Sequence, residues 1–167
     1  MKTTTPMARP QRRDRALHER IHDPYRMRDK PAGPVVCPTC GAFYTKGRWQ
    51  WPRQAVNGAH THPCPACQRI RDGMPAGHLT IEGWFVAPHK DEIIGLVRRC
   101  ESDEASTHPL HRIIAVREEG MHLEVTTTDI HLPRRIGEAL ARAYDGHLSY
   151  RYPAEEYALR VTWRRDD

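Results

Sequence analysis

The stretch CPTCGAFYTKGRWQWPRQAVNGAHTHPCPAC (37–67) contains two CPxC pairs that are separated by 23 residues. Two cysteines three positions apart on a tight turn can direct both sulfurs at one metal ion, and two such turns complete a tetrahedral set. Gly41, directly after the first pair, permits a backbone turn that points amide N–H groups at sulfur. We therefore predict one structural zinc ion, Zn²⁺, bound by Cys37, Cys40, Cys64 and Cys67.

Other uses of these cysteines are less well supported. Thiolates select zinc or iron over magnesium or calcium, and a rubredoxin-like iron site uses similar pairs, but Cys67 is not followed by the glycine that follows Cys40. No thioredoxin-like β-α-β pattern surrounds either pair, which argues against a redox role. His60 and His62 could each replace a cysteine, yet with four cysteines present we interpret them as polar loop residues. Four protein ligands leave no open position for water, so the site is expected to be structural.

The charge of the chain is unevenly distributed along its 167 residues. Residues 1–34 contain nine Lys/Arg and four Asp/Glu, residues 35–78 five and one, and residues 79–167 twelve and sixteen. The front of the chain is therefore basic and the back mildly acidic. This asymmetry favours a polyanionic partner that faces the front. The alternative is a solvated tail that only aids solubility.

The composition divides the chain into three parts. Residues 1–34 are rich in arginine and interrupted by prolines, so we expect a basic, flexible arm that orders on a partner, with two helical turns possible over 14–22. Residues 35–78 are expected to form the zinc ribbon, in which the segment between the cysteine pairs forms short strands and no helix. Residues 79–167 have the periodic patterns of an α/β domain, and a chain of this length accommodates such a domain beside a small module.

No apolar run approaches the roughly 20 residues that span a bilayer. The N-terminal residues also lack the apolar core of a secretory signal. We therefore expect a cytoplasmic protein with no membrane partner, and reducing conditions there favour metal binding by the cysteines over disulfides.

The α/β domain is predicted to have the element order β-α-β-β-α-β, which is the ferredoxin-like pattern, with one extra C-terminal strand. The expected elements are a strand at 79–86, a helix at 90–106, a hairpin of strands at 110–118 and 122–128, a helix from Thr128 or Asp129 to about 144, and strands at 147–152 and 158–163. The fold class is therefore α+β.

Apolar residues at helical and strand spacing predict the core of this domain. The predicted core side chains are Leu79, Ile81, Trp84 and Val86 in the first strand, Ile93, Leu96, Val97 and Cys100 in the first helix, and Leu132, Ile136, Leu140 and Ala143 in the second. Cys100 is interpreted as a small buried hydrophobe rather than a nucleophile.

Between the cysteine pairs, cations alternate with aromatic residues. Cations can contact phosphates, and a tryptophan can stack on an unpaired base. The candidate RNA-binding residues here are Lys46, Arg48, Trp49, Trp51 and Arg53. The sequence is equally compatible with a packing role, in which Trp49 and Trp51 pack the ribbon or join it to the α/β domain. One tryptophan could also bind RNA while the other packs. Arg12, Arg13 and Arg15 are a second candidate phosphate contact, similar to arginine-rich segments that fold on RNA.

The sequence has no motif typical of an enzyme. It lacks a phosphate-binding glycine loop, a nucleophile elbow and paired carboxylates at a known spacing. An acylphosphatase-type reaction would need a supporting asparagine, but Asn57 is the only one in the chain. His108, His111 and His131 could converge on a second metal ion, although no metalloenzyme motif contains them. We therefore expect a protein that is not an enzyme.

The residues TTTDIHLPRRIGEALARAYDGHLSYRY (126–152) and ALRVTW (158–163), together with the CPxCGAxY…GRWxW…CPxC ribbon, resemble a family of small, uncharacterised bacterial zinc-ribbon proteins. More distantly, they resemble the archaeal and eukaryotic adaptor family that accompanies export of the large ribosomal subunit. Positions comparable to that family's helix and closing strand are Thr128, Arg135, Ile136, Leu140 and residues 159–163. The resemblance implies zinc binding and an association with RNA or the ribosome.

Together, these features predict a non-enzymatic zinc-binding protein that associates with structured RNA, in the first place ribosomal RNA and the neighbouring ribosomal proteins. The alternative is a zinc-ribbon adaptor between proteins, without nucleic-acid binding.

Overall fold

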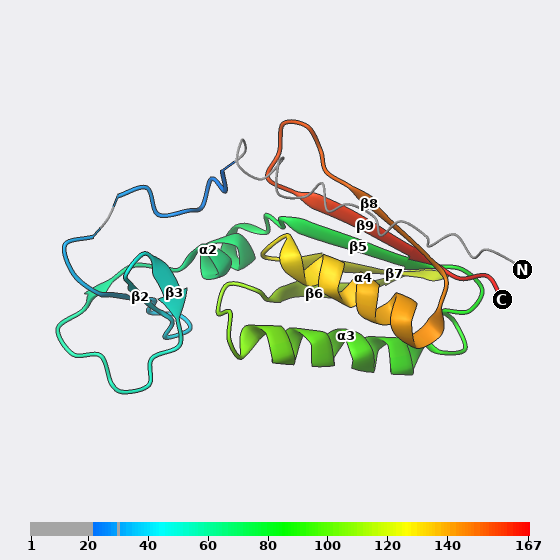
Figure 1. The fold of residues 1–167 in the computed structure, drawn as a ribbon, viewed down its shortest axis with the longest axis horizontal. Coiled ribbons are helices and arrows are strands. Elements are labelled where there is room, and N and C mark those ends of the chain that lie inside the picture. Colours follow the sequence, from blue (N-terminus) through cyan, green and yellow to red (C-terminus); the bar gives the residue numbers. More distant parts are fainter. Residues whose placement is uncertain (1–21, 30) are drawn as a thin grey trace, which may run out of the picture.

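The computed structural model describes residues 22–29 and 31–167. Within these residues the chain forms two sheets and three helices, so the α+β class is confirmed. The small ribbon sheet lies at one end of the molecule, the larger sheet at the other, and the helix α2 between them (Figure 1). None of the helices in the described part is both long and apolar enough to cross a membrane. The arginines at 12, 13 and 15 lie outside the described residues. So does the helix predicted over 14–22, except for its last residue.

The ribbon sheet confirms the short strands predicted around the cysteines. Its strand order is β3-β2-β1-β4. The strands are β1 (Val35–Val36), β2 (Phe43–Thr45), β3 (Arg48–Gln50) and β4 (His60–Thr61). Lys46 and Gly47 connect β2 to β3 with φ angles of 50° and 82°, the left-handed conformations that a two-residue hairpin turn requires. The hairpin therefore presents Lys46 and Arg48 at its tip.

A helix that the sequence did not predict follows the second cysteine pair. It is α2 (Pro65–Asp72), and it begins directly after Cys64, which is extended. Proline is favoured at the first helical position because its missing N–H has no helical partner there. The Sγ of Cys64 accepts a hydrogen bond from the N–H of Cys67 at 3.4 Å, and Gly73 ends the helix at φ 62°. The second metal-binding turn is thus also the first turn of a helix.

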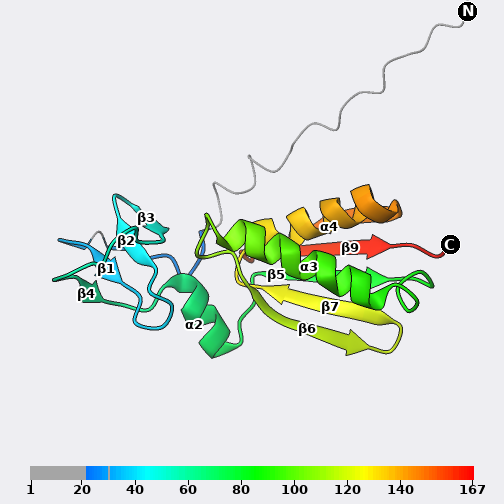
Figure 2. The same cartoon turned by 90° about the horizontal axis from the view of Figure 1, so that it is seen from below.

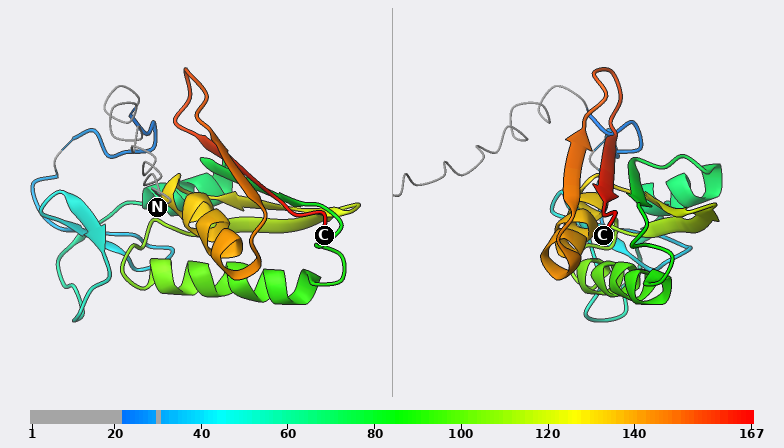
Figure 3. Two further views of the ribbon diagram at one scale, coloured as in Figure 1. Left: turned by 45° about the vertical axis from the view of Figure 1, so that its right-hand side comes forward. Right: turned by 90° about the vertical axis from the view of Figure 1, so that its right-hand side faces the viewer.

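The larger sheet has the strand order β6-β7-β5-β9-β8. Its elements are β5 (Gly77–Glu82), α3 (Lys90–Ala105), β6 (Ile113–Glu119), β7 (His122–Thr127), α4 (His131–Tyr144), β8 (His147–Arg151) and β9 (Leu159–Arg164). Strand β5 pairs parallel with β9, whereas the other neighbours pair antiparallel. Both α3 and α4 lie on one face of this sheet (Figures 2 and 3). The predicted order of strands and helices along the chain is therefore observed.

The complete ferredoxin-like topology is not confirmed. The unit β5-α3-β6, with β7 inserted between its strands, has the split β-α-β arrangement. On the other side of β5, however, the neighbour is the last strand, β9, and β8 forms the edge. The burial patterns explain this order. Every second residue of β9 is buried, whereas β8 is mostly exposed, which suits an edge strand.

The core of the α/β domain lies between the sheet and its two helices. It contains most of the predicted side chains, including Leu79, Ile81, Val86, Ile93, Leu96, Val97, Cys100, Leu132, Ile136 and Leu140, together with Trp163 from β9. Two predicted core residues are wrong. Trp84 is 67% exposed, because β5 ends at Glu82 and Gly83 turns the chain at φ 108°. Ala143 is exposed because it lies beyond the buried stripe of α4.

The start of α4 is fixed by Asp129. Its Oδ2 accepts hydrogen bonds from the N–H groups of His131 at 2.7 Å and Leu132 at 3.0 Å, so of the two predicted caps it is Asp129 that caps the helix. The side chain is buried, and burial raises the pKa of Asp129 to about 7. Its other oxygen, Oδ1, is buried without a hydrogen-bond partner among the described groups. A nearly buried carboxyl group therefore lies between α4 and the residues that follow α3.

Candidate metal centre

The four cysteines of the ribbon form one compact cluster. Their sulfur atoms all lie within 4.8 Å of one another, and those of Cys40 and Cys64 are 3.7 Å apart. A tetrahedral ion with metal–sulfur bonds of about 2.3 Å requires sulfur–sulfur distances of about 3.8 Å. Cys37 and Cys64 are fully buried, and Cys67 nearly so. The predicted cysteine cluster is thus confirmed as one that can hold a metal ion, and its geometry is consistent with zinc.

The backbone of the first pair turns as Gly41 predicts. Gly41 has a φ of 79°, and its N–H donates to the carbonyl oxygen of Cys37 at 2.9 Å. The next N–H, that of Ala42, points at the Sγ of Cys40 at 3.5 Å. Such N–H groups stabilise the negative charge of a thiolate.

Without a metal, neighbouring cysteines shift one another's thiol pKa values. The contact with Cys64 lowers the pKa of Cys40 to about 5, while the same contact and burial raise the pKa of Cys64. Four thiolates this close repel one another, and a divalent cation removes that repulsion. Metal binding at this cluster should therefore release protons.

Arg112, which the sequence analysis did not identify, contacts the cluster from the α/β domain. Its Nη2 lies 3.3 Å from the Sγ of Cys64 and 3.2 Å from that of Cys67. The backbone N–H of Arg112 donates to the Oγ1 of Thr128 at 3.0 Å, which fixes the start of β6. Four thiolates around one divalent ion have a net charge of −2, and Arg112 offsets part of it. No motif surrounds Arg112, so only the folded chain reveals this role.

Replacing Arg112 with glutamine should lower the affinity of the cluster for zinc. The partners of metal ligands typically contribute about 10–100-fold to affinity, so we expect a reduction in that range. Competition with a zinc chelator of known affinity would measure it. The matched control is Arg117→Gln, which removes the same charge from an exposed position on β6. Equal affinities for the two variants would show that the contact of Arg112 with sulfur is irrelevant to metal binding.

The two tryptophans of the ribbon have different surroundings. The Nε1 of Trp51 donates to the carbonyl oxygen of Ala105 at 2.5 Å, so Trp51 joins the ribbon to the end of α3. Trp49 is half-buried, packs beside the cysteine cluster, and has its ring centroid 5.4 Å from that of Tyr44. Both rings are half-buried, but of the two it is Trp49 that lines a cavity.

A cavity of about 340 Å³ lies between the β2–β3 hairpin and the α/β domain, and we call it the hairpin cavity. The ribbon contributes Tyr44, Arg48 and Trp49 to its lining. The other side is lined in part by Arg26, His108, His111 and Tyr157. Aromatic and cationic side chains from four separate segments therefore meet in one cavity.

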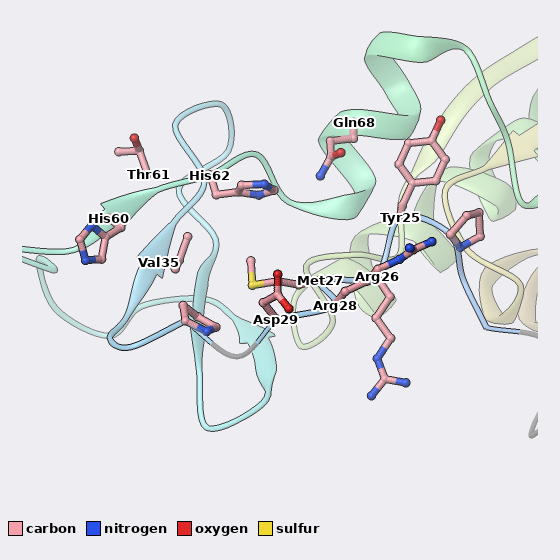
Figure 4. A pocket seen from close by; sticks show the side chains of 12 residues that line it. Tyr25, Arg26, Met27, Arg28, Asp29, Val35, His60, Thr61, His62 and Gln68 are labelled. Carbon is pink, nitrogen blue, oxygen red and sulfur yellow. The ribbon is translucent and has the colours of Figure 1, made fainter.

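A second cavity, of about 760 Å³, lies between residues 24–29 with Pro31 and the other side of the ribbon, and we call it the arm cavity (Figure 4). It is lined by Arg26 and Arg28 and, across from them, by His60, His62 and Gln68. The two histidines thus lie along this cavity, and the compact cluster of possible metal ligands contains the four cysteines without them.

The described end of the basic arm is docked on α2. Asp23 forms an ion pair with the buried Arg69 at 2.6 Å, and the ring of Tyr25 lies 4.4 Å from the guanidinium carbon of Arg69. The hydroxyl of Tyr25 donates to Asp72 at 3.1 Å. Residues 23–29 therefore form part of the wall of both cavities.

Several cations of the ribbon and the docked arm have no acidic partner among the described residues. Arg26, Arg28, Lys46, Arg48 and Arg53 are exposed, and none forms an ion pair with another residue in the described ranges. At the start of α4, by contrast, Arg135 is paired with Glu104, and Arg134 with Glu138 at 3.1 Å. Uncompensated positive charge is therefore present on the ribbon and the docked arm.

Fold and site together define a ribbon whose four cysteines can hold a metal ion and which contacts an α+β domain through Arg112. Comparison with family models, with curated proteins and with solved structures gave no match. The resemblances noted from the sequence therefore stay predictions, and the function must follow from the chemistry of the site itself.

Proposed function

We propose that this zinc-binding protein associates with structured RNA, with the ribosome as its principal site of action, and that it acts by binding and not by catalysis. The observation that carries the proposal is the hairpin cavity, in which the half-buried ring of Trp49 lies beside Arg26 and Arg48. An unpaired base can stack on such a ring while the cations contact its phosphates.

The unpaired cations support this proposal. Arg26 and Arg28 extend the positive charge from the hairpin cavity to the arm cavity, and Lys46 and Arg53 add to it on the ribbon. Cations that already have acidic partners gain less from a phosphate, because binding must first break an ion pair. A polyanion is thus better matched to the ribbon than to α4, where Arg134 and Arg135 are paired.

A protein adaptor is the second candidate, and one observation favours it. At the opposite end of β5, Trp84 is 67% and Met121 50% exposed, and both line one surface hollow. Exposed tryptophan is typical of sites that bind another protein. Under this alternative, Trp84 rather than the ribbon would carry the affinity.

The first test is sedimentation of cell lysate through a sucrose gradient at low and at high salt, with detection of the native protein. Co-migration with a ribosomal subunit at low salt, and release at high salt, is expected, because phosphate contacts weaken as counterions compete. Persistence at the top of both gradients would exclude the ribosome and direct attention to protein partners.

The RNA contact can be tested in vitro with a triple variant, Lys46→Ala, Arg48→Ala and Arg53→Ala. It should bind structured RNA more weakly, and the slope of log affinity against log salt should fall by about 1 for each phosphate that the protein no longer neutralises. The control is the variant Arg99→Ala, Arg117→Ala and Arg142→Ala, which removes the same charge from exposed sites on the α/β domain. Equal weakening in both variants would indicate only a nonspecific charge effect.

A further inference from the structure

A second group of metal-ligand side chains lies at the end of α3, outside the ribbon. Glu104 belongs to the last turn of that helix, and His108 and His111 follow in the loop before β6. One ligand atom from each lies within 4.8 Å of those from the other two. The Oε1 of Glu104 is 2.8 Å from the Nδ1 of His111 and 3.5 Å from the Nδ1 of His108. The two imidazole rings are stacked, with centroids 4.8 Å apart.

From this arrangement we propose a second metal site, in which Glu104, His108 and His111 bind a divalent transition-metal ion. Two imidazoles and one carboxylate suit ions such as zinc, nickel or cobalt, whereas magnesium and calcium prefer ligand sets made entirely of oxygen. From the sequence, His131 was a candidate third ligand beside His108 and His111. In the structure, it is the carboxylate of Glu104 that lies with the two histidines. The site does not depend on RNA binding.

The surroundings of the three side chains match those of a metal site. A metal-bound histidine usually directs its second ring nitrogen at a carboxylate, which fixes the orientation of the ring. The Nε2 of His111 lies 3.7 Å from the Oδ2 of Asp129. Asp129 is only 5% exposed, and its Oδ1 has no hydrogen-bond partner among the described groups. The Oε2 of Glu104 is held by Arg135. Arg135 thus already holds Glu104, and Asp129 lies close enough to His111 to accept a hydrogen bond from it after a small approach.

The proposed ion would be accessible, unlike the one in the cysteine cluster. With three protein ligands, a four-coordinate ion keeps one position for water or for an oxygen of a ligand. His108 and His111 both line the hairpin cavity, next to Trp49 and Tyr44. A molecule in that cavity could therefore reach the ion. The two sites also differ chemically, because the second one contains no sulfur.

The proposal can be tested by titrating Co²⁺ into the full chain with zinc already in the cysteine cluster, while the heat of binding and the near-ultraviolet and visible absorption are measured. One additional equivalent should bind with the absorption of cobalt in nitrogen and oxygen ligands. The thiolate-to-cobalt charge-transfer band should stay absent, because the cysteine cluster keeps its zinc. Binding that does not saturate at one further equivalent, or that appears only with the charge-transfer band, would overturn the proposal.

Variants separate a metal site from a simple ion-pair network. His108→Ala, at an exposed side chain, should abolish binding of the additional equivalent of Co²⁺. It should not alter the thermal stability of the protein when this second site holds no metal. His147→Ala, at an exposed position on β8, is the matched control and should bind as the unmodified chain does. Asp129→Asn, which can still cap α4, should weaken Co²⁺ binding about 10-fold or more. Unchanged binding in His108→Ala would overturn the proposal, and unchanged binding in Asp129→Asn would remove the role given to that carboxylate.

Discussion

Replacement of Cys64 with serine is expected to abolish metal binding at the ribbon and to unfold it. Cys64 contributes a ligand, accepts the hydrogen bond that begins α2, and contacts Arg112. Structural zinc contributes about 10–16 kcal/mol to the folding of small zinc-finger peptides. Because the ribbon has only a small core of its own, it cannot tolerate the removal of a large part of that free energy.

The thiolate-to-cobalt charge-transfer band of the Co²⁺-substituted protein measures metal binding at the ribbon. Cobalt bound at Glu104 does not contribute to this band, because that site contains no sulfur. The matched control is Cys100→Ala, which removes the one cysteine that lies outside the cluster, on the buried face of α3. That variant should retain the full band. If Cys64→Ser retained it as well, the four-cysteine site would be wrong.

Replacement of Gly77 with alanine is expected to destabilise the α/β domain by about 3 kcal/mol or more, at or above the upper end of typical overpacking costs. A Cβ at this position would lie 2.1 Å from the Oγ1 of Thr127, 2.5 Å from the carbonyl oxygen of Asp129 and 2.6 Å from the Cγ of Pro133. None of these atoms is the end of a flexible side chain that can move away. Gly77 pairs with β7 and β9 at once, so the strand cannot shift to make room.

Urea denaturation followed by circular dichroism would give the change in the free energy of unfolding. Gly95→Ala is the control, because a Cβ there meets only the end of Arg99 at 3.6 Å. Within helix α3, alanine is favoured over glycine by up to about 1 kcal/mol, so this variant should be neutral or more stable. A Gly77→Ala protein as stable as Gly95→Ala would contradict the close packing of β5 against the start of α4.

The features that the sequence predicts well depend on local spacing. The metal cluster follows from two CPxC turns, and the stripes of α3 and α4 follow from the helical period. Helix α2 was missed because its two turns are too short to show a period, and because its first residues are also the second metal-binding turn. Trp84 was assigned to the core because it continues the apolar residues of β5, but Gly83 ends that strand.

The remaining features depend on contacts between distant parts of the chain. Arg112 and Cys67 are 45 positions apart and meet only through the packing of the ribbon on the α/β domain. The same is true of the lining of the hairpin cavity, to which residues from five stretches of the chain contribute. The placement of β9 beside β5 also depends on the whole sheet. Strand β9 suits a central position better than β8 does, and the sequence of neither strand alone shows this.

The ribbon and the α/β domain are not separable modules, because the guanidinium group of Arg112 is half-buried and its anionic partners belong to the other unit. A fragment beginning at β5 would lose the thiolates that pair with this charge, and the guanidinium group would become open to water. The fragment would also uncover Leu110, which packs on the cysteine cluster. Removal of the metal should therefore loosen the packing at the start of β6. Through the hydrogen bond between Arg112 and Thr128, it should also affect the residues near the start of α4. The ribbon and the α/β domain are then expected to lose structure together when the metal is removed.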